Sequence, residues 1–228
     1  MDFSSFSLLQ VLEVIWINII LSGDNAVVIA LACRALPERQ RLIGMVLGAG
    51  VAILLRVVFT LFIATLLDLP FLRIIGAVLL FWIAVKLVTD EGNHGDEVAA
   101  SDKLWFAVRT VAIADAVMSL DNVLAIAAVA KDNKSMLVFG LIISIPLIVA
   151  GASLIMKMLE RFPILIWAGA ALLGWLAGEM LDSDPAVISW IGKDLAHKLE
   201  YPAAVVGAVL VVTVAYLLRR RRTAESAA

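Results

Sequence analysis

Long apolar runs separated by short polar connections make up most of this 228-residue chain. The runs have about the length that a helix needs to cross the hydrocarbon core of a bilayer, roughly 20 residues. Strands of a membrane β-barrel would be about ten residues long, with alternating apolar and polar side chains. The pattern therefore predicts seven membrane-spanning helices, over residues 8–32, 43–67, 70–89, 104–130, 135–156, 162–181 and 203–218.

The composition agrees with a bilayer as the solvent. Apolar residues make up 63% of the chain and charged residues 17%, whereas soluble domains have about 45–50% and about 25%. The mean hydropathy is +1.02. A net charge of -2, without a basic patch interleaved with aromatic residues, gives no sign of nucleic-acid binding. The single cysteine, Cys33, excludes an internal disulfide and a thiolate metal site.

Three connecting segments differ from the apolar runs. Residues 90–103 are acidic and predict a solvated linker between two halves of the chain, with weak metal collection as the alternative. Residues 182–202 carry apolar side chains at helical spacing and predict an external amphipathic segment at the membrane surface. Residues 219–228 begin with four arginines and predict a basic cytoplasmic tail. The whole chain, 1–228, is then a single transmembrane domain.

Basic residues near the helix ends predict the orientation in a bacterial inner membrane, because cytoplasmic connections carry an excess of Lys and Arg. Eleven basic residues lie on one set of alternate connections and five on the other, which places the N-terminus outside and the C-terminus inside. The first apolar run could instead be a cleaved signal peptide, since residues 30–32 resemble a cleavage site. No basic residue precedes that run and polar residues interrupt it, which favours a retained helix.

Two stretches of the first half recur in the second half. The sequence SGDN at residues 22–25 corresponds to SLDN at 119–122, and GAVLLFW at 76–82 corresponds to GAALLGW at 169–175. The order of the features is the same in both halves. We therefore expect an internal repeat.

The predicted repeat has a consequence for topology. Repeat one, about 8–89, and repeat two, about 104–181, each contain three predicted spanning helices, and a seventh helix follows at 203–218. Because three is odd, the second repeat enters the membrane from the opposite side. Inverted repeats of this kind are typical of secondary transporters, whose substrate sites lie near the membrane midplane. The predicted fold class is thus an all-α membrane protein with two inverted three-helix repeats and a C-terminal helix.

Acidic and amide side chains in the interior of the first and fourth predicted helices are the candidate site. A carboxylate at membrane depth costs several kcal/mol unless it is paired or ligated, so it indicates function by default. Asn18 and Asn25 are seven residues apart, as are Asp115 and Asn122, so each pair shares one helix face. The predicted metal ligands are Asp24, Asn25, Asp115, Asp121 and Asn122, and further pathway candidates are Glu13, Asn18, Ser22, Ser119 and Arg56.

These oxygen donors indicate a hard divalent cation such as Mg²⁺, Ca²⁺ or Mn²⁺, whereas Zn²⁺ and Cu⁺ sites use His and Cys. Two or three carboxylates also neutralise a dication and lower the cost of bringing it into a low dielectric. Interhelical hydrogen bonding is the structural alternative for these polar residues. Arg56 lies mid-way along the second predicted helix, and we expect it to pair with a buried aspartate when metal is absent.

The sequences LSGDNA at residues 21–26 and DAVMSLDN at 115–122 resemble the TerC-type integral membrane proteins, in particular their short YjbE-like branch. This family is similar to the larger LysE-like transporter group. The resemblance implies manganese export as the activity, and the family name refers to tellurium resistance. It also implies a metal-site role for the five predicted ligands. Large cytoplasmic domains of longer relatives have no counterpart in this sequence.

The sequence therefore predicts a divalent-cation transporter that exports Mn²⁺ by alternating access, with no enzymatic activity and no tightly bound cofactor. The expected partners are the lipid bilayer and the metal ion, and assembly as a homo-oligomer is compatible with the sequence. One alternative is a LysE-like exporter of amino acids or other small solutes. A second is an intramembrane aspartyl protease, and a third is a metal sensor or partner subunit that does not transport by itself.

Overall fold

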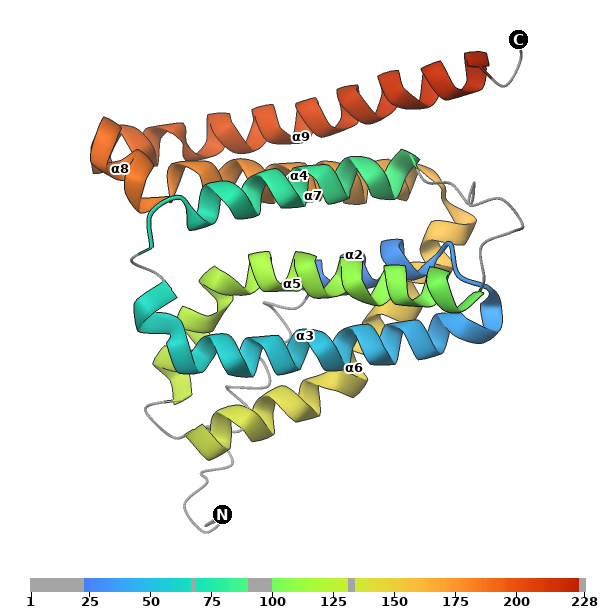
Figure 1. The fold of residues 1–228 in the computed structure, drawn as a ribbon, viewed down its shortest axis with the longest axis horizontal. Coiled ribbons are helices and arrows are strands. Elements are labelled where there is room, and N and C mark those ends of the chain that lie inside the picture. Colours follow the sequence, from blue (N-terminus) through green and yellow to red (C-terminus); the bar gives the residue numbers. More distant parts are fainter. Residues whose placement is uncertain (1–22, 67–68, 90–99, 131–133, 226–228) are drawn as a thin grey trace. The chain divides into compact units, whose positions relative to one another are not determined.

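The structure is a computed structural model that describes residues 23–66, 69–89, 100–130 and 134–225. All regular secondary structure within these ranges is helical (Figure 1). The helices are α2 (Gly23–Cys33), α3 (Glu38–Leu66), α4 (Leu72–Thr89), α5 (Ala100–Ala130), α6 (Lys134–Arg161), α7 (Ile164–Asp182), α8 (Pro185–Ile191) and α9 (Lys193–Glu225).

The chain forms two compact units, and neither coincides with one half of the sequence. Unit 1 comprises Met1–Leu67 and Ala100–Lys157, and unit 2 comprises Asp68–Ala99 and Met158–Ala228. Unit 1 therefore contains α2, α3, α5 and most of α6, whereas unit 2 contains α4, α7, α8 and α9. Each unit thus combines helices that precede and helices that follow the 90–99 connection.

In unit 1, α3 packs along α5, and α2 contacts both of them. A methyl group added at Gly44 would lie 3.3 Å from Leu104, and one added at Gly48 would lie 3.2 Å from Val111. Since these contacts advance together along both helices, α3 and α5 run in the same direction. Ile29 of α2 and Val111 of α5 are fully buried, so the contact surfaces are apolar at their centre.

In unit 2, α7 contacts both α4 and α9 (Figure 1). The α7–α9 contact depends on glycine: a Cβ at Gly174 would lie 2.6 Å from the carbonyl oxygen of Gly207. A Cβ at Gly178 would lie 2.6 Å from the Cα of Ala204. The later residue of α7 therefore contacts the earlier residue of α9. The two helices are therefore antiparallel and approach backbone to backbone, as helices with glycine four residues apart do in membranes.

Four helical stretches in the described residues are long and apolar enough to cross a membrane: Glu38–Phe59, Leu72–Thr89, Ile164–Asp182 and Lys193–Arg221. Large apolar side chains such as Trp82, Ile164 and Val209 point outwards and are exposed, which suits contact with lipid rather than water. Within the described residues, the prediction of an all-α fold with helices long enough to span a membrane is confirmed. The total of seven spanning helices and the inverted arrangement stay predictions.

The helix boundaries differ from the expected ones between residues 182 and 218. This stretch contains two helices, because α8 ends at Ile191, the next residue Gly192 adopts φ +80°, and α9 begins at Lys193. α9 then continues through Pro202 and includes the arginines after residue 218. Hydropathy marks only the part of a helix that lies in the hydrocarbon core, so the predicted 203–218 helix was shorter than the observed one. Residues 90–99 of the acidic linker lie outside the described residues, and α5 begins at Ala100.

Candidate metal centre

Asp24 and Asn25 lie in the first turn of α2. The Asp24 carboxylate accepts a hydrogen bond from the backbone N–H of Asn25, with Oδ1 2.8 Å from the nitrogen. The Asn25 side chain is only 3% exposed, and both of its amide atoms lack a hydrogen-bond partner among the described residues. A buried amide without a partner is rare in native proteins and calls for an explanation.

A second polar pair lies on α5. Asp115 is 3% exposed and Ser119 is fully buried. The Ser119 hydroxyl donates to Oδ2 of Asp115 over 3.0 Å, which is the bond expected between side chains one helical turn apart. α5 is continuous from Ala100 to Ala130, as expected because position 120 is leucine, whereas glycine occupies the matching position 23.

The contact between α2 and α5 places both polar pairs on neighbouring helices of unit 1. α6 also approaches here, since a Cβ added at Gly151 would lie 3.7 Å from the Cβ of Ala26. Small residues of α2 and α6, Ala26 and Gly151, therefore meet next to Asn25. The carboxylate and amide oxygens of the candidate site come from α2 and α5.

Several predicted site residues cannot be placed in the same way. Asp121 and Asn122 lie on α5 and Arg56 on α3, but their side chains are outside the described part of the structure. Glu13, Asn18 and Ser22 precede the described residues. Among the described side chains, no group of three or more His, Cys, Asp or Glu is arranged to hold a metal ion. The described ligand candidates are thus Asp24, Asn25 and Asp115, and Ser119 is hydrogen-bonded to Asp115.

Comparison with known proteins adds the family. The profile of the "Integral membrane protein TerC family" matches residues 3–224, nearly the whole chain. The chain belongs to the TerC family. TerC proteins are integral membrane proteins, so this chain is one as well, and its family is of the transporter type rather than an enzyme family.

Three relatives from Bacillus subtilis (strain 168) show how far the similarity extends. The chain is 36% identical to "Uncharacterized membrane protein YjbE" over 209 residues, which cover 92% of this chain and 95% of that protein. It is 22% identical to "Uncharacterized membrane protein YceF" over 218 residues, covering 92% of this chain and 82% of that protein. "Uncharacterized membrane protein YkoY" is 27% identical over 182 residues, covering 71% and 56%. No solved structure matches.

In this TerC protein, Asp184 is a polar residue whose role the sequence analysis did not predict. Its fully buried carboxylate accepts backbone N–H groups from Phe71 at 3.0 Å and Arg73 at 3.1 Å, at the start of α4, and from Ala186 at 2.8 Å in α8. The Arg73 guanidinium in turn donates to the carbonyl oxygen of Ser183 over 2.6 Å. Asp184 therefore joins α4 to the α7–α8 connection. An aspartate directly before proline is a common helix-capping pattern. The Asp-Pro pair at residues 184–185 could therefore have indicated from the sequence that Asp184 caps a helix.

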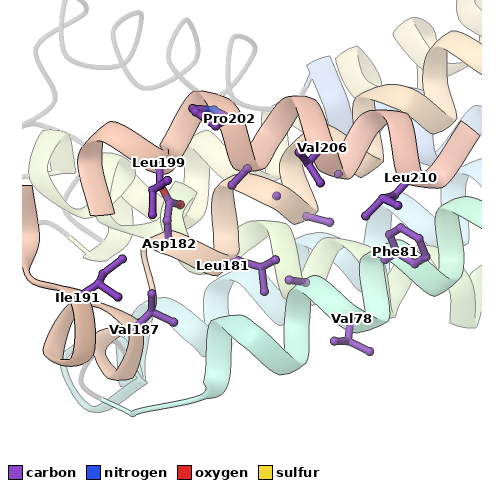
Figure 2. A pocket seen from close by; sticks show the side chains of 15 residues that line it. Val78, Phe81, Leu181, Asp182, Val187, Ile191, Leu199, Pro202, Val206 and Leu210 are labelled. Carbon is purple, nitrogen blue, oxygen red and sulfur yellow. The ribbon is translucent and has the colours of Figure 1, made fainter. Parts of the chain in front are cut away.

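Asp182 lines a cavity of unit 2 that has a volume of about 570 Å³. The lining comes from α4, α7, α8 and α9 and is apolar apart from this residue (Figure 2). The Asp182 side chain points from α7 toward Leu199 on α9 (Figure 2). Its Oδ1 is buried and has no hydrogen-bond partner among the described residues. Asp182 belongs to unit 2 and Asn25 to unit 1, so the two unpartnered polar groups are separate features of this TerC chain.

Proposed function

We propose that this protein moves a hard divalent cation, with Mn²⁺ as its substrate, out of the cell through a site formed by α2 and α5. The proposed ligands are the side-chain oxygens of Asp24, Asn25, Asp115, Asp121 and Asn122. Ser119 orients Asp115 through their hydrogen bond. The family's association with ion transport and the oxygen-only donor set both support this proposal.

The observation that carries the proposal is the side chain of Asn25, which is buried and has no hydrogen-bond partner among the described residues. Leaving a buried polar group unpaired costs about 1–3 kcal/mol. Asn25 lies next to the carboxylate of Asp24, and its unpaired amide carries this free-energy cost. The cost is explained if the amide oxygen is a ligand that coordinates the ion when the ion is bound. Amide and carboxylate oxygens are the donors that Mn²⁺, Mg²⁺ and Ca²⁺ accept.

Charge balance supports a dication rather than a monovalent solute. An isolated ion moved into a medium of low dielectric meets a desolvation penalty of several kcal/mol. The aspartates proposed on α2 and α5, namely Asp24, Asp115 and Asp121, would offset this penalty for a doubly charged ion. An amino-acid substrate would also need a donor for its carboxylate. In the described part of the site, the Ser119 hydroxyl already donates to Asp115, which leaves the neutral amide N–H of Asn25 as a donor, and none of the described site residues is cationic.

The burial pattern of unit 2 supports the inverted repeat. Positions 93 residues apart in α4 and α7 are equivalent in the predicted repeat, and six of the eight buried residues of α4 have a buried counterpart in α7. The pairs are Gly76 and Gly169, Ala77 and Ala170, Leu80 and Leu173, Ala84 and Ala177, Val85 and Gly178, and Leu87 and Met180. The two helices are also antiparallel, because Asp184 after α7 binds the start of α4.

The proposed mechanism is alternating access. Unit 1 contains helices from both repeats, including α2 and α5, so both repeats contribute to the proposed ion site. The orientation that we propose, with the N-terminus outside and the C-terminus inside a bacterial inner membrane, follows from the eleven-to-five distribution of basic residues.

The test is Mn²⁺ flux by the purified full-length chain in liposomes that contain a metal-quenched dye. Asp24→Asn and Asp121→Asn should each abolish flux, because each removes one charge from the site. Asp194→Asn, which changes an exposed aspartate in the first turn of α9, is the matched control and should leave flux unchanged. Excess Mg²⁺, Ca²⁺ and Zn²⁺ as competitors give the selectivity. Well-folded protein without flux under any ion gradient would contradict the proposal.

A further inference from the structure

A basic pocket of about 350 Å³ lies at one end of unit 2 and is lined by Trp167, Tyr216, Arg219 and Arg220. Trp167 is near the start of α7, and the other three residues are near the end of α9. The antiparallel contact of these helices brings the two ends together. The pocket is within the size range of small-molecule sites, about 300–1,000 Å³.

The side chains of this pocket are suited to an anion. The guanidinium carbon of Arg219 lies 5.9 Å from the centre of the Trp167 ring, which is within the range of a cation–π contact. Arginine presents donors in a planar fork that matches the oxygens of a phosphate. The next two residues, Arg221 and Arg222, are also basic.

The surroundings of the pocket favour a ligand with an apolar part. Tyr216 is exposed, as are its neighbour Leu217 and, one turn before Trp167, Ile164. In a membrane protein these apolar residues face acyl chains. Tryptophan and tyrosine are enriched where the hydrocarbon core meets the headgroups. The pocket thus combines a headgroup-level aromatic pair, two guanidinium groups and an adjoining apolar surface.

We propose that this pocket binds the phosphodiester headgroup of an anionic membrane lipid, whose acyl chains lie along the exposed apolar residues of α7 and α9. Basic clusters immediately after a spanning helix, and basic pockets between such helices, recognise anionic lipids in this way. Free phosphate offers the same oxygens but would make no use of the apolar surface. The assignment is independent of metal transport, because it concerns a different unit and a different ligand.

The test is native mass spectrometry of the full-length chain with phosphatidylglycerol and phosphatidylcholine that carry identical acyl chains. The wild-type chain should retain phosphatidylglycerol about tenfold better, as expected for charge-assisted hydrogen bonds. Arg220→Gln should remove most of this preference. Arg221→Gln removes the same charge one residue further along, at an exposed position that is not among the lining residues, and should keep the preference. Trp167→Leu should weaken retention of phosphatidylglycerol without changing the charge.

Three results would overturn the proposal. Equal retention of the two lipids by the wild-type chain would exclude headgroup recognition. Equal losses in Arg220→Gln and Arg221→Gln, with no effect of Trp167→Leu, would show that only the diffuse charge of the tail attracts lipid. Displacement of phosphatidylglycerol by millimolar inorganic phosphate would assign the pocket to a soluble anion. A thermal unfolding curve for each variant ensures that only folded protein is compared.

Discussion

Substitution of Asn25 by leucine separates the ligand role of this residue from any structural role. The side chain is 3% exposed and neither amide atom has a hydrogen-bond partner among the described residues. Leucine has a similar length and no polar atoms, so it removes the unpaired groups without leaving a large cavity. We therefore expect Asn25→Leu to stabilise the metal-free protein.

The magnitude follows from two contributions. Removing an unpaired buried amide should recover about 1–3 kcal/mol. Leucine also has a higher helix propensity than asparagine by a few tenths of a kcal/mol, and Asn25 is within α2. The expected gain in the free energy of unfolding is thus about 1–3 kcal/mol. In the wild-type chain, Mn²⁺ at one hundred times its dissociation constant should add about 2.7 kcal/mol, and this addition should vanish in Asn25→Leu.

The assay is thermal unfolding in detergent with and without Mn²⁺. Thr110→Val is a control, because Thr110 is a buried polar residue on α5 that has no proposed ligand role. This control should keep the Mn²⁺-dependent rise in melting temperature. If Asn25→Leu lowered the melting temperature of the metal-free protein and Mn²⁺ still raised it fully, then Asn25 would be a structural residue and the argument from its unpaired amide would fail.

Four further substitutions, one of them a matched control, test the packing and the support of the site. Gly178→Ala should destabilise unit 2 by at least about 1–3 kcal/mol, because the added methyl group meets backbone atoms of α9 that cannot move aside. Gly50→Ala in α3 is the control: nothing lies within 4 Å of the added methyl group, so this substitution should stabilise the protein by up to about 1 kcal/mol. Melting temperatures that change in the same direction in both variants would refute this reasoning. Asp184→Ala should lower stability by at least about 2 kcal/mol, because several backbone N–H groups lose a charged acceptor, and an unchanged denaturation midpoint would contradict that. Ser119→Ala removes the hydrogen bond to Asp115 and should weaken Mn²⁺ binding about tenfold in a titration. An unchanged Mn²⁺ affinity would show that Asp115 is not a ligand whose orientation depends on Ser119.

The sequence predicted the apolar helices well where hydropathy decides the outcome. The expected spans 70–89 and 162–181 agree closely with α4 and α7. It did not predict how the helices group, because the compact units join helices from distant parts of the chain. The close α7–α9 contact could not be predicted either. A glycine such as Gly174 has no side chain to indicate its neighbour, and only the structure shows the backbone of α9 against it.

For the candidate site, the sequence singled out three of the six polar residues that are buried in the described part of the structure. Asn25, Asp115 and Ser119 were selected because polar groups in an apolar run need a reason, and all three are buried. Hydrogen bonding at the helix ends was harder to predict. Asp184 was assigned to a surface segment, since the sequence of a connection does not reveal which distant N–H groups its side chain will reach. Asp182 likewise became notable only through its buried, unpartnered oxygen.

The most direct test of the central claim is an anomalous scattering measurement on crystals grown with Mn²⁺, recorded at the manganese absorption edge. The account predicts one strong peak beside the Asn25 side chain, between α2 and α5, with carboxylate oxygens among the ligands at about 2.0–2.6 Å, as for other hard cations. The peak should be absent in crystals of Asn25→Leu. A manganese peak elsewhere in the protein, with the amide of Asn25 still unpartnered, would contradict the assignment of α2 and α5 as the ion site.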